Sequence, residues 1–336
     1  MEDYHVREVT KLGSNENPLG VSPRVKDAIV SALERVHQYP DPGCNQLRRR
    51  LAARLGVSTD HLMVANGVDN VLTCFCLAFL DPGDRCVIGA PSYSAYASLI
   101  LLMGAVPVEV PLRDWRFDVS AMAAAAGSSK ALIICNPNNP TGTIVRQDEV
   151  VALLRNTPPT TLVVLDEAYA EWAEDPGFPD GVALLRQHPN LVLMRTFSKL
   201  YGLAGLRVGY SVAAPDLTAC LYQVREPFPV DRLAQVAAEA VLEDKQYLRA
   251  SFENNRTGKA FLYGMFTDMG LTYVPSQANF IFLDLKQPAD DVAERLLPRG
   301  VIIRPGKIWK MPTWARITIG TPEENRRLAE ALRAVL

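Results

Sequence analysis

Short apolar runs alternate with helix-like segments between residues 62 and 212, and this alternation limits the possible folds more than any other feature of the sequence. Each run has the length of one buried strand. The runs begin at Leu62, Arg85, Ala131, Leu162, Leu191 and Val208. Strands that alternate with helices along a chain are typical of a mostly parallel sheet with helices on both faces. The sequence therefore predicts an α/β fold.

The pattern changes near residue 213, where long helical segments replace the alternation. Further strands and helices then follow at 278–284, 288–297, 301–304, 315–319 and from 322 onward. They predict a smaller α+β unit. Because 336 residues are enough for two domains, we expect a large domain and a small domain built from both termini. The predicted large domain covers residues 28–222, and the small domain covers residues 1–27 and 223–336.

Composition and charge exclude several classes of protein. The 35 basic and 37 acidic side chains nearly balance, so the chain as a whole has no electrostatic footprint for nucleic acid. No run of about 18 apolar residues occurs and the N-terminal residues are polar, so we expect neither a membrane span nor a secretory signal. The six cysteines lack C-x-x-C spacing and most lie in apolar runs, which is typical of reduced, buried thiols in a cytoplasmic protein. The four histidines lie far apart, and we expect no metal site.

Lys199 lies in the stretch that most narrows the possible chemistry, Arg-Thr-Phe-Ser-Lys-Leu-Tyr-Gly-Leu-Ala-Gly-Leu-Arg-Val-Gly-Tyr at 195–210. The hydroxyls and the nearby cation of this stretch belong to Thr196, Ser198 and Arg207. Such donors, together with glycines that allow the backbone to approach closely, suit a small phosphate group. A lysine among them could form a Schiff base with pyridoxal phosphate. The alternative is that this lysine is a solvated surface charge.

Polar or aromatic residues also follow the other strand-like runs. In an open parallel sheet these strand ends lie at the edge where ligands bind. The residues concerned are Val68, Asp69, Tyr93, Asn139, Asp166 and Tyr169. Singly they have ordinary alternatives, such as a helix cap for Asp166 or a core position for Tyr93. Together they supply what a pyridoxal ring requires: N–H groups for the phosphate, an aromatic face, donors for the phenolic oxygen and a carboxylate for the ring nitrogen.

Four segments resemble the fold-type I, class I and II aminotransferases, which use pyridoxal phosphate. They are Asn-Pro-Asn-Asn-Pro-Thr-Gly at 136–142, Leu-Asp-Glu-Ala-Tyr at 165–169, the stretch at 195–210, and Arg-Ile-Thr-Ile-Gly-Thr at 316–321. Within this family the chain is most similar to the histidinol-phosphate aminotransferases. The resemblance extends from about residue 11 to the C-terminus, in the family's order.

The resemblance implies a catalytic role for three residues. Lys199 would be the Schiff-base lysine and would move a proton during the reaction. Asp166 would pair with the ring nitrogen. Tyr169 would bond the ring oxygen together with Asn139, and Tyr93 would stack on the ring.

The resemblance also implies how the cofactor phosphate is held. The groups concerned are Thr196, Ser198, Arg207 and the backbone of Val68 and Asp69. Family members are homodimers with active sites at the subunit interface. Tyr39 would therefore reach the cofactor phosphate of the neighbouring subunit.

Two arginines near the C-terminus are the expected substrate anchors. Arg316 lies in an apolar strand, where an arginine is rarely buried without an anion, and the resemblance places the substrate carboxylate on it. Arg304 matches the family's second arginine and would bind a substrate phosphate. Lys307 and Lys310 add positive charge to the same loop, although a solvated loop explains them as well. Leu19 departs from the family, which usually has a phosphate-binding tyrosine at this position.

These features predict an aminotransferase that acts on histidinol phosphate, with 2-oxoglutarate or glutamate as the partner. Leu19 leaves open an aminotransferase for aromatic or specialised amino acids. A phosphothreonine-decarboxylase-like enzyme has less support, because those relatives tend to have threonine in place of Ser198. A non-catalytic sensor is a third hypothesis. Such regulators carry a DNA-binding domain ahead of this fold, whereas the motifs here begin near residue 11.

Overall fold

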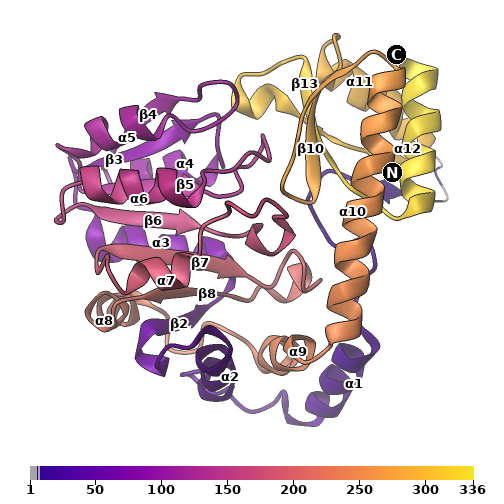
Figure 1. Ribbon diagram of the computed structural model, residues 1–336. Coiled ribbons are helices and arrows are strands. Elements are labelled where there is room, and N and C mark those ends of the chain that lie inside the picture. Colours follow the sequence, from indigo (N-terminus) through magenta and orange to yellow (C-terminus); the bar gives the residue numbers. More distant parts are fainter. Residues whose placement is uncertain (1–5, 7) are drawn as a thin grey trace.

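A seven-stranded sheet organises the larger of two units in this computed structural model, which describes residues 6 and 8–336 (Figure 1). Its strands are β2 (Leu62–Ala65), β3 (Arg85–Ala90), β4 (Val106–Pro111), β5 (Ala131–Cys135), β6 (Leu162–Asp166), β7 (Leu191–Thr196) and β8 (Gly209–Ala213). Their order is β2-β8-β7-β6-β5-β3-β4, and all neighbours are parallel except β8, which runs antiparallel to β2 and β7. The predicted α/β class with a mostly parallel sheet is therefore confirmed.

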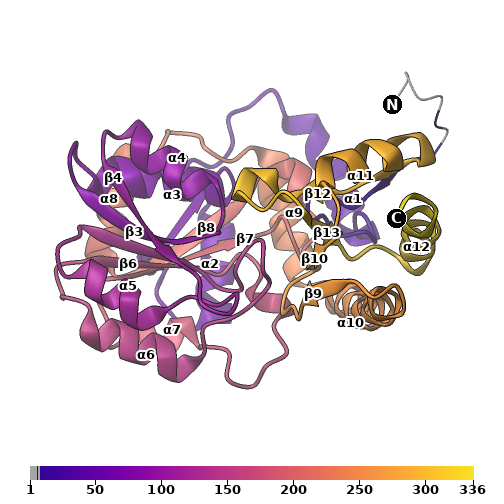
Figure 2. The ribbon, with the colours of Figure 1, turned by 90° about the horizontal axis from the view of Figure 1, so that it is seen from above.

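Helices cover both faces of this sheet (Figure 2). One face carries α5 (Val119–Ala126), α6 (Gln147–Asn156) and α7 (Gly181–Leu185), and the other carries α3 (Gly67–Phe79), α4 (Ala95–Leu102) and α8 (Pro215–Val224). Every residue of β5, β6 and β8 is buried. Because both faces are covered, these strands are apolar along most of their length and do not alternate with polar residues.

The smaller unit is an antiparallel sheet packed against helices. Its four strands, in spatial order, are β12 (Arg304–Pro305), β13 (Trp314–Thr318), β10 (Phe280–Asp284) and β9 (Thr272–Val274). Its helices are α10 (Lys245–Asp268), α11 (Ala289–Leu296) and α12 (Pro322–Val335). The N-terminal strand β1 (Thr10–Lys11) pairs in parallel with β11 (Val301–Ile302), so both ends of the described chain contribute to this unit.

The two units have separate hydrophobic cores. The smaller core includes Leu12 together with residues of α10, β10, β13 and α12. The larger core includes five residues of α9 (Arg232–Leu242), although the predicted boundary assigns this segment to the small domain. α9 also packs against α1 (Pro23–Ala32), and α2 (Asn45–Leu55) lies beside it. By their packing, α1, α2 and α9 therefore belong with the larger unit.

Three elements of the larger unit, α5, α7 and β4, were not predicted. α5 ends in the alanine run at 123–126 and begins where Asp118 caps the Ala121 N–H. α7 is a short helix that begins where Asp180 caps the Ala183 N–H. β4 contains two prolines, and proline is confined to edge strands because it cannot donate a ladder hydrogen bond. β4 is indeed the edge strand and pairs only with β3. The strand predicted at 301–304 is two short strands, β11 and β12.

Within the described residues, no helix combines the length and the apolar character needed to cross a membrane. The polar N-terminal residues, for which we expected no secretory signal, lie mostly outside the part of the chain that the structure describes.

Candidate active site

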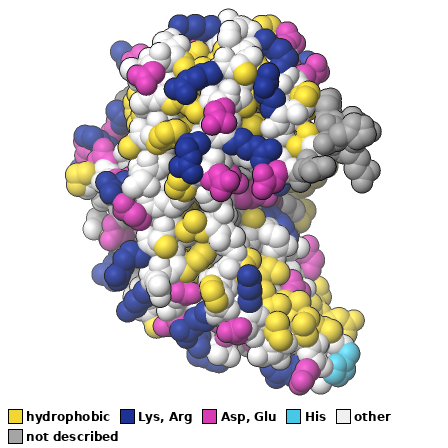
Figure 3. Space-filling model, turned by 90° about the vertical axis from the view of Figure 1, so that its right-hand side faces the viewer, with side chains coloured by type: hydrophobic (Ala, Val, Ile, Leu, Met, Phe, Trp, Pro, Cys, Tyr) yellow, Lys and Arg dark blue, Asp and Glu magenta, His cyan; other side chains and the backbone are white. Residues whose placement is uncertain are grey.

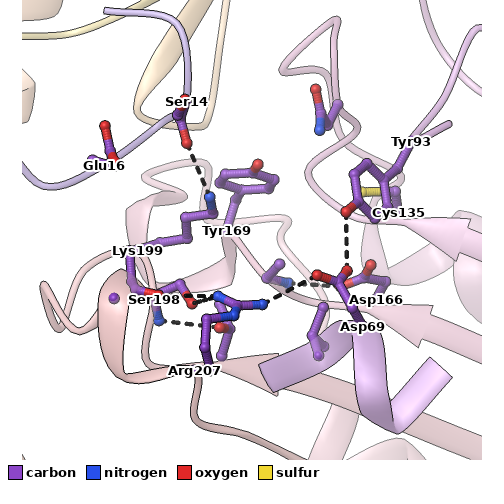
Figure 4. A pocket seen from close by; sticks show the side chains of 16 residues that line it. Ser14, Glu16, Asp69, Tyr93, Cys135, Asp166, Tyr169, Ser198, Lys199 and Arg207 are labelled. Atoms are coloured by element: carbon purple, nitrogen blue, oxygen red, sulfur yellow. Dashed lines mark hydrogen bonds and ion pairs between the residues drawn. The ribbon is translucent and has the colours of Figure 1, made fainter. Parts of the chain in front are cut away.

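A cavity of about 330 Å³ lies at the carboxyl ends of the parallel strands, on the side that faces the smaller unit (Figure 4). Its volume is within the range of roughly 300–1,000 Å³ that is usual for small-molecule sites. All residues predicted to contact the cofactor line it, except Tyr39. Those residues are Val68, Asp69, Tyr93, Asn139, Asp166, Tyr169, Thr196, Ser198, Lys199 and Arg207.

Asp166 is the last residue of β6 and is 3% exposed. Its Oδ2 accepts a hydrogen bond of 2.6 Å from the Tyr96 hydroxyl, and its Oδ1 accepts one of 3.1 Å from the Ala168 N–H. Burial raises the pKa of this carboxyl to about 6, against the opposing effect of these donors. A buried carboxylate with few donors is suited to pair with a cationic group that a ligand brings.

Lys199 faces the cavity from the opposite side, beyond the end of β7 (Figure 4). Its Nζ lies 3.4 Å from the Ser14 carbonyl oxygen and 5.5 Å from the centre of the Tyr169 ring. Burial, together with the positive charge of Arg316, lowers the pKa of the amine to about 8. A larger fraction of this amine is therefore uncharged near neutral pH than in an exposed lysine, as a nucleophile or base requires.

An anion-binding corner forms where the start of α3 meets Arg207. Arg207 donates to Ser198 Oγ at 3.3 Å and pairs with the Asp69 carboxylate at 3.1 Å. The first N–H groups of a helix have no partner within the helix, and Val68 and Asp69, from the first turn of α3, line the cavity at this corner. Gly67 leaves the space for the guanidinium, because a Cβ there would lie 2.7 Å from Arg207 Nη2. Thr196 stands beside them and accepts from the Ser198 N–H at 3.0 Å.

Tyr169 and Tyr93 border the cavity between these groups. Tyr169 is 4% exposed, and its hydroxyl oxygen accepts a hydrogen bond of 2.9 Å from Asn15 Nδ2. The Tyr93 hydroxyl donates to Asp69 Oδ1 at 2.9 Å. Burial raises the pKa of both hydroxyls, so both keep their protons at neutral pH and remain able to donate.

Arg316 joins the smaller unit to the cavity wall. Its Nη1 donates to Asn139 Oδ1 at 2.6 Å and its Nη2 donates to the Gly13 carbonyl oxygen at 2.7 Å. It is 7% exposed, its Nε is buried without a partner, and it forms no ion pair with any described residue. Burial lowers its pKa to about 10. Since a buried guanidinium is rarely left without an anion, this arginine is suited to bind an anionic ligand.

Arg316 itself is not among the residues that line the cavity, and the remaining predicted residues also lie outside the lining. Arg304 is exposed, and its Nε donates to the Gly13 carbonyl oxygen at 3.4 Å. Lys307 and Lys310 are 80% and 89% exposed at their side chains and approach Asp290 and Glu109. Two further residues, Leu19 and Tyr39, are 38% and 79% exposed.

Several residues at the site were missed from the sequence. Tyr96, which bonds Asp166, is within a helix with no polar pattern that singles it out. Ser14, Asn15 and Glu16 belong to the sequence Ser-Asn-Glu-Asn-Pro at 14–18, and Ser14 and Glu16 line the cavity. Serine, asparagine and proline are ordinary turn residues, so this sequence alone gave no signal of a site.

Comparison with known proteins gives a consistent result. The family model described as aminotransferase class I and II matches residues 7–332. The histidinol-phosphate aminotransferase of Moorella thermoacetica is 46% identical over 333 residues, which cover 98% of this chain and 86% of that protein. The enzyme of the same name from Symbiobacterium thermophilum is 46% identical over 332 residues, 98% of this chain and 91% of that protein.

A solved structure has the same fold over the whole chain. It is the crystal structure of histidinol-phosphate aminotransferase from Sinorhizobium meliloti in complex with pyridoxal-5'-phosphate. The TM-score is 0.93 at 31% sequence identity, and the match covers 100% of this chain and 94% of the other.

Proposed function

This chain belongs to the class I and II aminotransferases, and we propose that it transfers an amino group between histidinol phosphate and 2-oxoglutarate or glutamate, with pyridoxal phosphate as cofactor. The observation that carries the proposal is the placement of Lys199 and Asp166, which face one cavity from the ends of adjacent parallel strands. The relatives that are 46% identical share the histidinol-phosphate name, which favours this substrate over the aromatic and decarboxylase alternatives.

The residues of the cavity fit pyridoxal phosphate. A corner with a guanidinium, hydroxyls and free helix N–H groups suits the phosphate, and Gly67 keeps that corner open. The buried carboxyl of Asp166 suits a protonated ring nitrogen. When bound, this cofactor supplies an aldehyde that bonds covalently to amines and a ring that withdraws electrons from them.

Lys199 then has two tasks. Its amine would hold the cofactor covalently in the resting enzyme, and the free amine would move a proton to or from the substrate carbon. Both tasks require the uncharged amine, and the lowered pKa of about 8 makes this form accessible near neutral pH. Asp166 would hold a proton on the ring nitrogen, because a cation beside its buried carboxylate replaces the missing solvation.

Asn139 and Arg316 act as one unit. Because Asn139 Oδ1 accepts from Arg316, its Nδ2 remains free to donate to the ring oxygen. The Nε of Arg316, which is buried without a partner, and the N–H groups that these bonds leave free would bind an anion of the substrate, which is a carboxylate in glutamate and a phosphate ester in histidinol phosphate. Arg304 beside it supplies a second positive charge.

The test uses the purified holoenzyme. Reduction with borohydride should fix the cofactor to the peptide that contains Lys199, and Lys199→Ala should abolish both this label and turnover. Lys310→Ala, a variant at an exposed lysine, should keep both. Each amine is then added alone, and the visible absorption band of the bound cofactor is followed. Histidinol phosphate should bleach it. A response to phenylalanine, tyrosine or phosphothreonine but not to histidinol phosphate would overturn the substrate assignment.

We propose further that two copies form a homodimer in which Tyr39 completes the neighbouring site. Tyr39 is 79% exposed and stacks on Phe228, with ring centroids 4.5 Å apart. Val30, Leu33 and Val36, at and beyond the end of α1, are each between 48% and 64% exposed. Figure 3 shows the side of the molecule that lies at the right in Figure 1, and apolar side chains gather at its lower end. Clustered exposed apolar groups favour a protein interface.

Mixed dimers test this role of Tyr39. Lys199→Ala and Tyr39→Ala chains are each expected to be nearly inactive alone. If Tyr39 acts across the interface, a dimer of one chain of each kind contains one intact site and regains activity. If Tyr39 acts within its own chain, neither site of the mixed dimer is intact and no activity returns.

A cytoplasmic location is also proposed. Five of the six cysteines are buried as free thiols, and no disulfide forms among the described residues. Burial raises the pKa of Cys76 to about 12, so this thiol resists oxidation. Reduced buried thiols are usual in the cytoplasm.

A further inference from the structure

Asn15 connects the Tyr169 hydroxyl to the strand that carries Arg316. It is 1% exposed and its φ of 56° is in the left-handed region that asparagine tolerates. Its side chain contacts Tyr169 through Nδ2 at 2.9 Å and Thr318 through Oδ1 at 3.1 Å. Its backbone N–H lies 2.9 Å from the same Thr318 oxygen. No task at the site has so far been assigned to Asn15 or Thr318.

The placement of the Asn15 amide, with Oδ1 toward Thr318 and Nδ2 toward Tyr169, sets the direction of these hydrogen bonds. Thr318 Oγ1 accepts from the Asn15 backbone N–H, and because an amide oxygen has no proton, the Thr318 hydroxyl donates its own proton to Asn15 Oδ1. An amide oxygen that accepts from Thr318 leaves Nδ2 to point at Tyr169, and Nδ2 can only donate. The Tyr169 oxygen is therefore an acceptor in this bond.

The proton of the Tyr169 hydroxyl must then point elsewhere. Within the described part of the chain, the bond from Asn15 is the one hydrogen bond at this oxygen. Tyr169 lines the cavity, and the Phe280 ring packs edge-on against its ring at a centroid distance of 5.0 Å. The remaining direction for the proton is the cavity.

We propose that Asn15 and Thr318 are positioning residues that turn the Tyr169 hydroxyl into an obligatory donor toward the ring oxygen of the cofactor. This inference rests on the proposed function, because that function supplies the ring oxygen. If Thr318 is lost, the Asn15 amide can turn its oxygen toward the Tyr169 hydroxyl, and if Asn15 is lost, the hydroxyl proton can rotate toward water. In both cases the donor is lost for part of the time. A preset donor costs no reorganisation during the reaction.

The same arrangement connects the cofactor side to the substrate side. Thr318 and Arg316 are two residues apart on β13, so their side chains leave the same face of the sheet. That face meets the segment 13–15, where Arg316 bonds the Gly13 carbonyl oxygen and Thr318 bonds Asn15. A shift of β13 would therefore move Arg316, the proposed substrate anchor, together with Thr318, which orients the Tyr169 hydroxyl through Asn15.

The pH-dependent colour of the bound cofactor reports on this donor. When the bound cofactor loses a proton, its ring oxygen carries more negative charge. A hydrogen bond donated by the Tyr169 hydroxyl therefore favours this deprotonated form of the cofactor. Loss of the donor should raise the pH of the colour change. The groups that act on Tyr169 from its surroundings are Arg316, Asp166 and Cys135, with Lys199 over its ring. None of them is changed in the variants below.

The experiment titrates the holoenzyme between pH 5 and 10 and compares four single variants. Tyr169→Phe should move the colour change upward by about one to two pH units, the usual effect of a hydrogen bond to a charged group. Asn15→Gly, which keeps the left-handed backbone, and Thr318→Val should move it in the same direction by about one unit. Thr318→Ser should restore the value of the unmodified protein.

A double variant separates orientation from simple structural damage. If Asn15 acts through Tyr169, Asn15→Gly combined with Tyr169→Phe shifts the colour change no further than Tyr169→Phe alone. Additive shifts, or unchanged titrations in Asn15→Gly and Thr318→Val, would overturn the inference. These results are distinct from failure of the proposed function, in which the unmodified protein binds no cofactor and shows no visible band to titrate.

Discussion

Arg304 and Arg316 are directly opposite each other in the antiparallel pair of β12 and β13. Directly opposite residues share one face of a sheet, and like charges in this position destabilise it. The positive charge of Arg304 indeed contributes, after burial, to the lowered pKa of Arg316. A dianionic group bound between them would remove this repulsion, and a phosphate ester supplies such a group.

Arg304→Ala should therefore weaken the binding of the phosphorylated substrate more than that of the unphosphorylated substrate. We expect KM for histidinol phosphate to rise roughly 10-fold or more, in line with about 1.5–3 kcal/mol for a charge-assisted hydrogen bond, while KM for glutamate rises less. Steady-state kinetics with each amino donor measures the difference. Lys310→Ala is the control because its side chain is 89% exposed and approaches Glu109. Equal effects of Arg304→Ala on both donors would show that Arg304 has no preference for phosphate.

Arg316→Lys should impair both substrates. Lysine keeps the charge but lacks the planar fork that binds Asn139, Gly13 and an anion at the same time. We expect kcat/KM to fall roughly 10- to 100-fold for histidinol phosphate and for glutamate alike. The cofactor absorption band should remain, because Lys199 and Asp166 are unchanged. A loss of cofactor binding in this variant would show that the bond between Arg316 and Asn139 is needed to hold the cofactor and not only to orient the Asn139 amide.

The sequence was sufficient to predict the sheet and most of the cavity lining. Buried parallel strands appear as short apolar runs, and the groups at their ends, such as Asp166 and Lys199, converge because the strand ends share one edge. β4 was missed because its prolines and exposed residues resemble those of a loop. An edge strand tolerates such residues, because one of its sides has no neighbouring strand to bond. The observed ends of several helices and strands differ by a few residues from the predicted ends, as is usual for element boundaries.

The groups that were missed act through tertiary contacts. Asn15 reaches Tyr169 across 154 positions of sequence and Thr318 across 303, and no local pattern encodes such pairings. Tyr96 gave no signal because a buried tyrosine in an apolar helix is indistinguishable from a core residue until its partner is known. Tyr39, in contrast, was predicted, but from the family resemblance and not from its own sequence context, since its proposed partner belongs to a second copy of the chain.

Gly67→Ala should weaken cofactor binding. The added Cβ would lie 2.7 Å from Arg207 Nη2 and displace the guanidinium from Asp69 and Ser198. We expect the Kd for pyridoxal phosphate to rise roughly 10- to 100-fold, in line with loss of a charge-assisted bond. Equilibrium dialysis against the cofactor measures this directly.

Gly83→Ala is the matched control for this substitution. Gly83 has a similar left-handed φ of 88°, but an added Cβ there meets nothing within 4 Å. Both variants should lose about 1–2 kcal/mol of stability from backbone strain, and only Gly67→Ala should bind the cofactor more weakly. Equal Kd values for the two would mean that strain, and not the clash with Arg207, explains any loss.

Asp166→Asn should stabilise the cofactor-free protein above pH 6 while it disables the enzyme. Burial raises the pKa of Asp166 from 3.8 to about 6, so the folded protein keeps a proton that the unfolded chain has released between these values. The free energy of unfolding therefore falls as pH rises through this window, by at most about 3 kcal/mol. Because asparagine carries no charge, the free energy of unfolding of the Asp166→Asn variant does not fall in this way.

The difference in melting temperature between the two proteins isolates this effect, because other titrating groups such as Glu171 are common to both. Without cofactor, Asp166→Asn should melt higher than the unmodified protein at pH 8 and close to it at pH 4. With cofactor the order at pH 8 should reverse, since a protonated ring nitrogen stabilises the carboxylate and not the amide. A difference that does not depend on pH would mean that the carboxyl keeps an ordinary pKa, and the proposed role of Asp166 would then lose its electrostatic basis.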